Sequence, residues 1–567
     1  MVWAVILASL AMAAPAQESS IFSRKDIFHP EFAAHGMVAT QEAVATRTGV
    51  EILKAGGNAI DAAVAVAFTL AVTLPQAGNL GGGGFMLIHS AQTGGTVALD
   101  YRETAPGAST RDMYLDAKGN VDQRKSRYTR FAAGVPGTVA GLVAALSRYG
   151  SMPLRQVIAP AIRLAKEGII VIPALAASLE AAREKLLANA AAARIFYHPD
   201  GTPYRPGERL IQKDLAWSLE QIAENGARAF YSGKIAGRII ADMQKHGGPM
   251  KAQDLSAYRP VIRRPVEGTY RGHTIRSMPP PSSGGVHLVQ ILNILEDFPV
   301  AFLGHNSADG IHLMAEAMKL AYADRSEHLG DPDFWRVPVA GLTSKRYAAR
   351  LRQQIRLDRA RPSKEIKPGN PLPYESNETT HFSVMDRFGN AVSNTYTINF
   401  SYGAGIVAEG TGILLNNEMD DFSAKPGVPN AYGLVGGEAN AVAAGKRPLS
   451  SMTPTIVLRD GKPWLATGSP GGSRIITTTL QIIVNVIDHG MNIAAATAAP
   501  RVHHQWLPDE LRMEAGISVD TLDLLRARGH VIAVKNAMGS TQTVMRVENG
   551  FLGASDPRRT GALAAGY

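Results

Sequence analysis

One threonine stands where a chain could cut itself and then use its new end as a nucleophile. Thr379 follows a charged stretch broken by prolines, residues 364–378, and precedes a run with the alternation of a β-strand. A threonine hydroxyl is too weakly acidic to attack a carbonyl unaided. A chain break before Thr379 would free an α-amine, with an ordinary pKa of about 7.7–8.0, as a general base on the same residue. The pattern also fits an ordinary strand, because threonine is common in strands.

Three further segments carry groups that could assist such chemistry. Arg102 follows a predicted strand at 97–101, where a guanidinium could bind a carboxylate in bidentate fashion or form a surface ion pair. The acidic segment 418–421 could hold an ammonium group or could serve caps and turns. Gly471 and Gly472, between a predicted strand and helix, could direct backbone N–H groups at an oxyanion. Each pattern has a structural explanation as well, so only the combination can indicate a function.

The histidines offer a pair of metal ligands but no complete ligand set. His312 and Glu316 lie one helical turn apart, which could place both on one helix face. No third ligand stands at a suitable spacing, so we favour a structural role for them, and for His503 and His504 too. The sequence holds 0 cysteines, which excludes thiolate catalysis, disulfides and Cys-ligated zinc. We therefore expect no metal and no cofactor.

The elements that must position these groups are a mixture of helices and strands. The strand before residue 386 should place Phe382 and Val384 on one face and His381 and Ser383 on the other, with a turn at 386–390. We predict strands over 85–89, 97–101, 380–385, 391–398, 455–458 and 463–467. We predict helices over 41–55, 59–73, 286–296, 312–323 and 475–487, and a helix-rich region over 151–245 that covers a sheet.

The bulk composition describes a folded protein of enzyme size. The 567 residues suffice for two or three domains or for one large layered fold, with 45% hydrophobic and 19% charged residues. The formal net charge is +9, but the lysines and arginines are scattered and are not interleaved with aromatic residues. We therefore expect no nucleic-acid partner, and a mild basic excess also favours small anionic substrates.

The N-terminus has the pattern of an export signal. An apolar run over 2–14 is followed by Ala-Pro-Ala-Gln at 14–17, which fits a signal-peptidase site, so we expect a signal peptide at 1–16. The absence of a positive segment before the run departs from that pattern. The apolar stretch 62–74 is too short to span a bilayer, so we expect no stable membrane span. The predicted location is periplasmic or secreted.

Motifs along nearly the whole chain, in family order, resemble the γ-glutamyltransferase (γ-glutamyltranspeptidase) family of N-terminal nucleophile hydrolases. The matching segments are Asp100–Glu103, Ala323–Ser326, Glu378–His381, Asn416–Phe422, Lys446–Met452 and Gly468–Arg474. The resemblance implies an α+β fold, a four-layer αββα sandwich. It also implies that one precursor supplies a large subunit, 17–378, and a small catalytic subunit, 379–567, which build the sandwich jointly.

The resemblance assigns roles to individual residues. It implies cleavage between Glu378 and Thr379, with Thr379 as the nucleophile of both processing and catalysis and Thr397 supporting its hydroxyl. Gly471 and Gly472 would form the oxyanion hole. Substrate-binding roles fall to Arg102, Ser450 and Ser451 for an α-carboxylate, to Asn399, Glu418 and Asp421 for an α-ammonium group, and to Tyr432 as the gating aromatic of a lid over 422–447. Position 418 is Glu where some relatives carry Gln, and either can accept a hydrogen bond from an ammonium group.

The implied activity is cleavage of the γ-glutamyl amide of glutathione and related compounds through a threonine ester. Water, amino acids or peptides would then accept the acyl group, and the two chains from one precursor would form a heterodimer. Two alternatives stay open. The first is a glutaryl or cephalosporin-type acylase of the same superfamily, against which the retained Asn399, Glu418 and Asp421 argue. The second is a binding relative that has lost processing.

Overall fold

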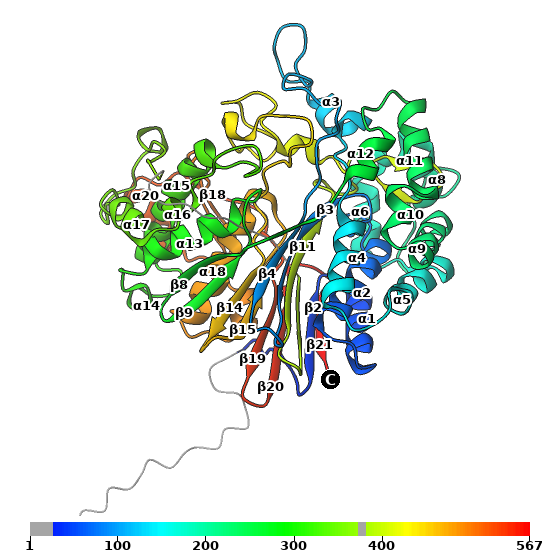
Figure 1. Cartoon of the computed structure of the whole chain (residues 1–567). Coiled ribbons are helices and arrows are strands. Elements are labelled where there is room, and N and C mark those ends of the chain that lie inside the picture. The colour runs from blue at the N-terminus through cyan, green and yellow to red at the C-terminus, as the bar shows by residue number, and fades with distance from the viewer. Residues whose placement is uncertain (1–26, 372–381) are drawn as a thin grey trace, which may run out of the picture.

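Two seven-stranded antiparallel sheets form the centre of the molecule (Figure 1). The computed structural model describes residues 27–371 and 382–567. The first sheet has the order β1 (Glu31–Ala33), β20 (Gly550–Ser555), β19 (Gln542–Val547), β15 (Lys462–Thr467), β14 (Thr455–Arg459), β9 (His273–Ser277) and β8 (Val266–Tyr270). The second has the order β21 (Leu563–Gly566), β2 (Gly36–Thr40), β10 (Ser383–Asp386), β11 (Ala391–Thr397), β3 (Gly83–His89), β4 (Thr96–Tyr101) and β7 (Val261–Arg263).

The two sheets pack face to face over a shared apolar interior. In β3, Phe85 and Leu87 belong to the cluster between the sheets, whereas Met86 and Ile88 point to the helices outside. This alternation is what a strand buried on both faces requires, and it explains why β3 reads as a continuous apolar run. Ile456 and Val544 meet these side chains from the first sheet.

Helices cover both outer faces of the pair of sheets. On the second sheet lie α1 (Ala43–Lys54), α2 (Ala59–Thr73) and α4 (Thr138–Tyr149), with α5 (Leu154–Glu167) and α9 (Lys213–Asn225) outside them. On the first lie α13 (Gly284–Leu295), α15 (Ala308–His328) and α18 (Ile475–Ile487). The order helix, sheet, sheet, helix confirms the predicted α+β four-layer sandwich.

Several predicted elements are confirmed to the residue, and others differ at their ends. Helix α2 begins and ends as predicted because Asn58 and Asp61 form a capping box, and it is buried on all sides. Helix α18 also matches its prediction. Helix α15 runs from Ala308 to His328, longer at both ends than the predicted 312–323, and Ser307 caps its N-terminus by accepting the N–H of Gly310.

The β10–β11 hairpin lies at the centre of the second sheet, between β2 and β3. The Asp386 carboxylate accepts the N–H groups of Phe388 and Asn390, which confirms the predicted turn. Phe382 and Val384 pack toward the helices, while Ser383 donates to the carbonyl of Gln542 in the first sheet. The alternation is therefore confirmed for the described part of this strand, whose predicted start at Thr380 lies outside the described residues.

Short elements complete the fold. They are α3 (Gln123–Tyr128), α6 (Pro173–Ala181), α7 (Arg183–Leu187), α8 (Ala190–Phe196), α10 (Ala227–Tyr231), α11 (Lys234–Lys245), α12 (Ala252–Ala257), α14 (Val300–Leu303), α16 (Val339–Leu342), α17 (Lys345–Arg352), α19 (Ile493–Ala498), α20 (Val519–Ala527), β5 (Ile169–Ile170), β6 (Arg209–Leu210), β12 (Val407–Ala408), β13 (Ile413–Leu414), β16 (Val502–His503), β17 (Leu511–Met513) and β18 (Ile532–Val534). Within residues 27–371 and 382–567, no helix combines the length and apolarity needed to cross a bilayer.

Candidate active site

A cavity of about 1600 Å³ opens where several central strands end. Thr397 ends β11, Arg102 follows β4, and Gly471 follows β15 by a short turn. Every predicted site residue in the described part of the chain lines this cavity: Arg102, Thr397, Asn399, Glu418, Asp421, Tyr432, Ser450, Ser451, Gly471 and Gly472. Glu378 and Thr379 lie outside the described residues. The fold thus brings together groups that lie far apart in the sequence.

Arg102 holds two of the predicted ammonium-binding carboxylates. Its Nη1 donates to Glu418, its Nη2 donates to Asp421 at 2.6 Å, and its Nε donates to the carbonyl of Pro448 at 3.1 Å. The guanidinium is fully buried, so the alternative of a surface ion pair is wrong. Binding of a ligand carboxylate by Arg102 stays a prediction, because each of its nitrogens already has a protein partner.

Two of the carboxyl groups beside Arg102, those of Glu418 and Glu103, have raised pKa values. Burial raises the pKa of Glu418 well above its ordinary value, even against the attraction of Arg102. Burial likewise raises the pKa of Glu103 to about 8, and its carboxylate lies 3.7 Å from Arg102. Within the described residues, neither Glu103 oxygen has a hydrogen-bond partner, and the same is true of Oε2 of Glu418. Glu418 lines the cavity whereas Glu103 does not, so a ligand ammonium group could supply the missing hydrogen bond of Glu418 and a charge that favours its ionised form.

The third acidic residue of this segment turns away from the cavity. Asp420 accepts hydrogen bonds from Ser126 at 2.8 Å and from Arg127 at 3.1 Å. Its position separates it from Glu418 and Asp421, although the sequence places the three together. The segment 418–421 therefore places two carboxylates in the cavity and binds helix α3 with the third.

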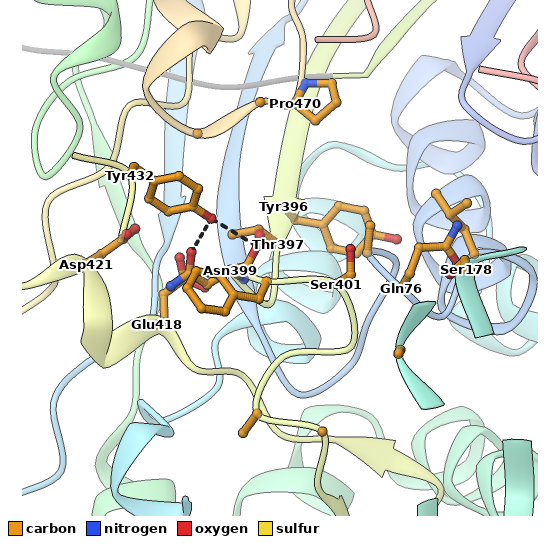
Figure 2. Close-up of a pocket in the computed structure, with 18 of the residues that line it drawn as sticks. Gln76, Ser178, Tyr396, Thr397, Asn399, Ser401, Glu418, Asp421, Tyr432 and Pro470 are labelled. Atoms are coloured by element: carbon orange, nitrogen blue, oxygen red, sulfur yellow. Dashed lines mark hydrogen bonds between the residues drawn. The ribbon is translucent and has the colours of Figure 1, made fainter. Parts of the chain in front are cut away.

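Tyr432 and Asn399 cover the middle of the cavity (Figure 2). The Tyr432 hydroxyl donates to Oδ1 of Asn399 at 2.7 Å, and Asn399 Nδ2 donates to the carbonyl of Asn417 at 3.0 Å. Asn399 has φ of 70°, and its backbone N–H donates to Oγ1 of Thr397 at 2.8 Å. Thr397 therefore keeps its own hydroxyl proton for another partner. Such a donor fits the predicted support of a neighbouring nucleophile.

The Gly471–Gly472 turn has the backbone that an oxyanion hole needs. Both residues have positive φ, 140° and 60°, a backbone conformation that residues other than glycine rarely adopt. A Cβ at Gly472 would lie 2.8 Å from the Tyr432 ring, so only glycine lets the ring pack there. Among the described residues, neither N–H group has a hydrogen-bond acceptor. Two free donors beside the cavity are suited to bind a developing negative charge.

The cavity extends beyond the predicted site, to a wall that sequence reasoning did not identify. In Figure 2, Glu418 and Asp421 lie at one end of the view, and Gln76 and Ser178 lie at the other. Lys185 also lines this wall and donates to the carbonyls of Ser401 and Gly403. Burial lowers its pKa to about 8. No sequence signal marks this wall, because its helices α6 and α7 contain no motif that indicates chemistry.

Arg325 is a second residue to which the sequence gave no role. It belongs to a motif of the family resemblance, Ala323–Ser326, but its side-chain hydrogen bonds reach residues distant in sequence. It lines the cavity beside Ser450 and Ser451 and donates to Oγ of Ser451 at 3.1 Å. The adjacency could not be read from spacing, because 126 residues separate the partners.

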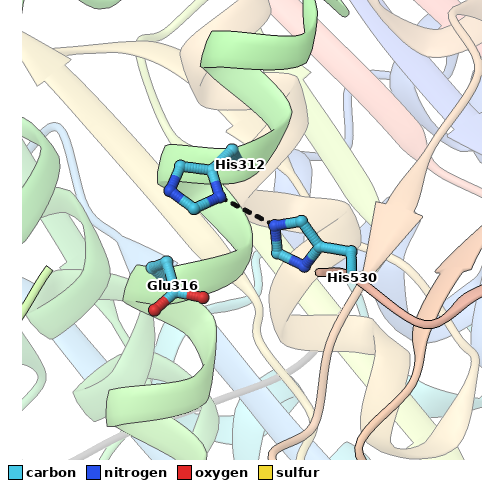
Figure 3. A group of neighbouring side chains, drawn as sticks. All are labelled: His312, Glu316 and His530. Atoms are coloured by element: carbon cyan, nitrogen blue, oxygen red, sulfur yellow. Dashed lines mark hydrogen bonds between the residues drawn. The ribbon is translucent and has the colours of Figure 1, made fainter. Parts of the chain in front are cut away.

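The predicted pair His312 and Glu316 has a third neighbour, His530 (Figure 3). The sequence spacing offered no third ligand, but the fold brings His530 beside the pair. However, His312 Nδ1 and His530 Nε2 are hydrogen-bonded at 2.8 Å, and His312 Nε2 donates to the carbonyl of Arg356 at 2.6 Å. Lys319 lies 2.5 Å from the Glu316 carboxylate. These contacts satisfy the groups internally and favour the structural role.

An αββα sandwich with a polar cavity at its strand ends is the architecture of the N-terminal nucleophile hydrolases, and comparisons with known proteins agree. The profile of the family described as Gamma-glutamyltranspeptidase matches residues 45–566. The chain belongs to the γ-glutamyltranspeptidase family. It is 59% identical over 560 residues to "Glutathione hydrolase proenzyme" of Escherichia coli (strain K12), covering 99% of this chain and 96% of that protein.

Solved structures agree with this assignment. The structure of Helicobacter pylori gamma-glutamyltranspeptidase is 47% identical with a TM-score of 0.59, covering 60% of this chain and 97% of the other. The cephalosporin acylase from Bacillus halodurans has a TM-score of 0.85 over 98% of this chain and 99% of the other, at 31% identity. The acylase thus shares the whole fold but is more distant in sequence than the glutathione hydrolase relative.

Proposed function

We propose that this chain is an autoprocessing γ-glutamyltransferase with glutathione hydrolase activity. The observation that carries the proposal is the convergence of Glu418, Asp421 and Asn399 on one cavity that Gly471 and Gly472 also line. A zwitterionic γ-glutamyl head needs an anionic and a cationic anchor, and an amide-cleaving enzyme needs oxyanion donors. The sequence relationship to a glutathione hydrolase supports the same substrate class.

Processing would come first. Oγ of Thr379 attacks the carbonyl carbon of Glu378, and the peptide nitrogen of Thr379 leaves with a proton, which gives an ester. Water then hydrolyses this ester, so that Glu378 ends as a carboxylate and Thr379 regains its hydroxyl beside a free α-amine. The products would be a large chain, 17–378, and a small chain, 379–567, which remain paired because strands of both parts share each central sheet.

Catalysis would repeat this chemistry on a substrate. The α-amine of Thr379 takes the hydroxyl proton, Oγ attacks the γ-carbonyl, and the N–H groups of Gly471 and Gly472 stabilise the oxyanion. The leaving amine, such as cysteinylglycine from glutathione, takes the proton and departs, which leaves a γ-glutamyl ester on Thr379. Water, an amino acid or a peptide then attacks the ester and restores the enzyme.

The binding groups divide by charge. Glu418, Asp421 and Asn399 would receive the α-ammonium group, and Ser450 and Ser451 would receive the α-carboxylate. Arg102 would also bind the α-carboxylate. The ammonium group would replace part of the contact that Arg102 makes with Glu418 and Asp421, which would free the guanidinium for this role. Tyr432 would act as the gate, since its hydroxyl holds Asn399 and its ring packs on Gly472. The lid would be residues 422–447.

We further propose that the protein is exported after removal of residues 1–16, and that its partners are small γ-glutamyl substrates and amine acceptors. The proposed export rests on the signal-like N-terminus. The proposed partners rest on the cavity, since its volume exceeds what a γ-glutamyl group alone would fill and leaves room for an acceptor. Residues 1–16 lie outside the described residues.

One gel and one pair of substrates test the proposal. The purified parent should split into two chains, Thr379→Ala should stay whole, and Thr379→Ser, which keeps a hydroxyl, should split more slowly. The processed parent should cleave a γ-glutamyl anilide at least about 10-fold faster than a glutaryl anilide, which lacks the α-ammonium group. A preference for the glutaryl compound would identify an acylase instead, and a parent that stays whole would refute the catalytic assignment of Thr379.

A further inference from the structure

The loop that joins β11 to β12, residues 399–405, has an unusual backbone. Four of its residues have positive φ: 70° at Asn399, 61° at Tyr402, 54° at Gly403 and 76° at Gly405. Asn399 and Tyr402 carry side chains, for which this conformation is unfavourable. Contacts from outside the loop must therefore hold it in place.

The same loop presents Asn399 and Phe400 to the cavity. Oδ1 of Asn399 accepts the Tyr432 hydroxyl at 2.7 Å (Figure 2), and the rings of Phe400 and Tyr432 meet edge to face with their centroids 5.8 Å apart. Two partners of Tyr432 thus come from one loop. A shift of the loop would move the amide that we propose to bind the ammonium group, together with the ring that covers it.

Lys185, on α7, holds this loop from the far wall of the cavity. Its Nζ donates to the carbonyls of Ser401 and Gly403, the second at 3.2 Å. In the described part of the chain, neither carbonyl accepts a backbone N–H group. An ammonium group binds a carbonyl oxygen more strongly than a neutral donor does. One side chain therefore secures two backbone groups of the loop.

The stem of Lys185 also fits the loop closely. A Cβ at Gly405 would lie 2.4 Å from Cγ of Lys185 and 3.0 Å from its Cδ, so only glycine at 405 leaves room for the stem. Burial lowers the pKa of Lys185 to about 8, which leaves most of it protonated at pH 7. Packing and hydrogen bonds thus place the same charge.

We propose that Lys185 is a positioning residue for the ammonium end of the site: it holds the 399–405 loop so that Asn399 faces the cavity and Phe400 packs on Tyr432. The inference rests on the proposed function, because it takes Asn399 as a ligand of the substrate ammonium group. Lys185 belongs to the proposed large chain and the loop to the proposed small chain. The lysine would therefore keep the site of the small chain in order after cleavage.

The test compares two anilides that differ only in the ammonium group, which the γ-glutamyl anilide carries and the glutaryl anilide lacks. Lys185→Met keeps the bulk of the stem without the charge. At pH 7 we expect it to raise KM for the γ-glutamyl anilide about 10-fold, with kcat changed less than about threefold. Its kcat/KM for the glutaryl anilide should change less than about threefold. Equal losses on both substrates would overturn the proposal in favour of a scaffold role.

The matched control is Lys234→Met, on α11 of the same proposed chain. The Lys234 side chain is exposed and does not line the cavity. This variant should change KM for either substrate less than about twofold. A rise in KM like that of Lys185→Met would overturn the proposal, because loss of any lysine charge would then suffice.

A double-mutant cycle tests whether Lys185 acts through Asn399. In an Asn399→Ala background, Lys185→Met should change KM for the γ-glutamyl anilide less than about twofold, because the amide that it positions is gone. Effects that multiply would overturn the proposal. Lys185→Arg keeps the charge and the stem atoms beside Gly405, so its KM should stay within about threefold of the parent. An Arg variant as poor as the Met variant would contradict the role of the charge.

Splitting into two chains on a gel verifies that each variant folds. Lys185→Gln replaces the Met variant in the cycle if that variant stays whole, and loss of splitting in both would overturn the proposal by assigning Lys185 to folding or processing. A parent that fails to cleave the γ-glutamyl anilide would refute the proposed function. A parent that cleaves it, with effects that multiply in the cycle, would refute only the role of Lys185.

Discussion

Two buried polar clusters in this molecule contain similar residue types and differ in what satisfies them. The cavity cluster comprises Arg102, Glu103, Glu418 and Asp421, and the histidine cluster comprises His312, Glu316, Lys319 and His530. Both mix carboxylates with cations in the interior. In the cavity cluster, both oxygens of Glu103 and one of Glu418 have no hydrogen-bond partner in the part of the chain that the structure describes. No buried side-chain atom of the histidine cluster is left without one.

The difference follows from what lies next to each cluster. The histidine cluster holds the chain segment after α17: His312 donates to the carbonyl of Arg356, and Lys319 donates to the carbonyl of Arg361 at 2.7 Å. Backbone groups therefore complete it. Three members of the cavity cluster, Arg102, Glu418 and Asp421, line a large opening, where a ligand can complete the free oxygen of Glu418. Unmet hydrogen-bonding capacity beside an opening is thus a better guide to function than residue type.

The largest effect on stability should come from breaking the closed cluster. Glu316→Ala leaves Lys319 buried without its carboxylate partner at 2.5 Å, so we expect a loss of about 3–5 kcal/mol in the free energy of unfolding. The KM and kcat of the protein that remains folded should be unchanged. Denaturant unfolding and anilide kinetics measure the two quantities. The control is Glu327→Ala on the same helix, whose exposed side chain should cost under about 0.5 kcal/mol.

The open cluster should respond in the opposite way. Asp421→Asn removes a charge that would bind the ammonium group, so we expect KM for a γ-glutamyl anilide to rise about 30-fold, or about 2 kcal/mol. Asp420→Asn is a matched control, because this neighbouring carboxylate binds Ser126 and Arg127 instead, and it should change KM less than about twofold. Similar rises in KM for both variants would mean that proximity in sequence, rather than the cavity, sets the effect.

Sequence reasoning reached the fold and most of the site for physical reasons. An apolar run of helical length after Asn58 fixes α2 locally, and the motifs around Thr397, Glu418 and Gly471 lie within short segments. Arg325 and His530 could not gain their roles this way. Arg325 meets Ser451 across 126 residues, and His530 meets His312 across 218. Contacts of that kind depend on how the layers pack, which spacing along the chain does not encode.

A smaller effect concerns pH and the proton on Glu103. Its pKa is raised to about 8 by burial, so the folded state keeps a proton that the unfolded chain loses above about pH 4.5. The stability contributed by this group is therefore present at low pH and is lost as pH rises through about 8. Between pH 6 and pH 9 the parent should lose at least about 1.4 kcal/mol more stability than Glu103→Gln, which cannot ionise. Parallel unfolding curves at the two pH values would show that Glu103 is ionised in the folded protein.

The smallest expected effect is the response of the histidine cluster to zinc. An ion there would have to replace the His312–His530 hydrogen bond of 2.8 Å and approach a carboxylate that Lys319 already neutralises. We therefore expect equimolar zinc to shift the melting temperature by less than about 1 °C, since only a ligand that binds the folded state stabilises it. His530→Ala should show the same response as the parent. A rise of several degrees in the parent that disappears in His530→Ala would make this cluster a metal site, and it would show that internal hydrogen bonds do not close a cluster to ligands.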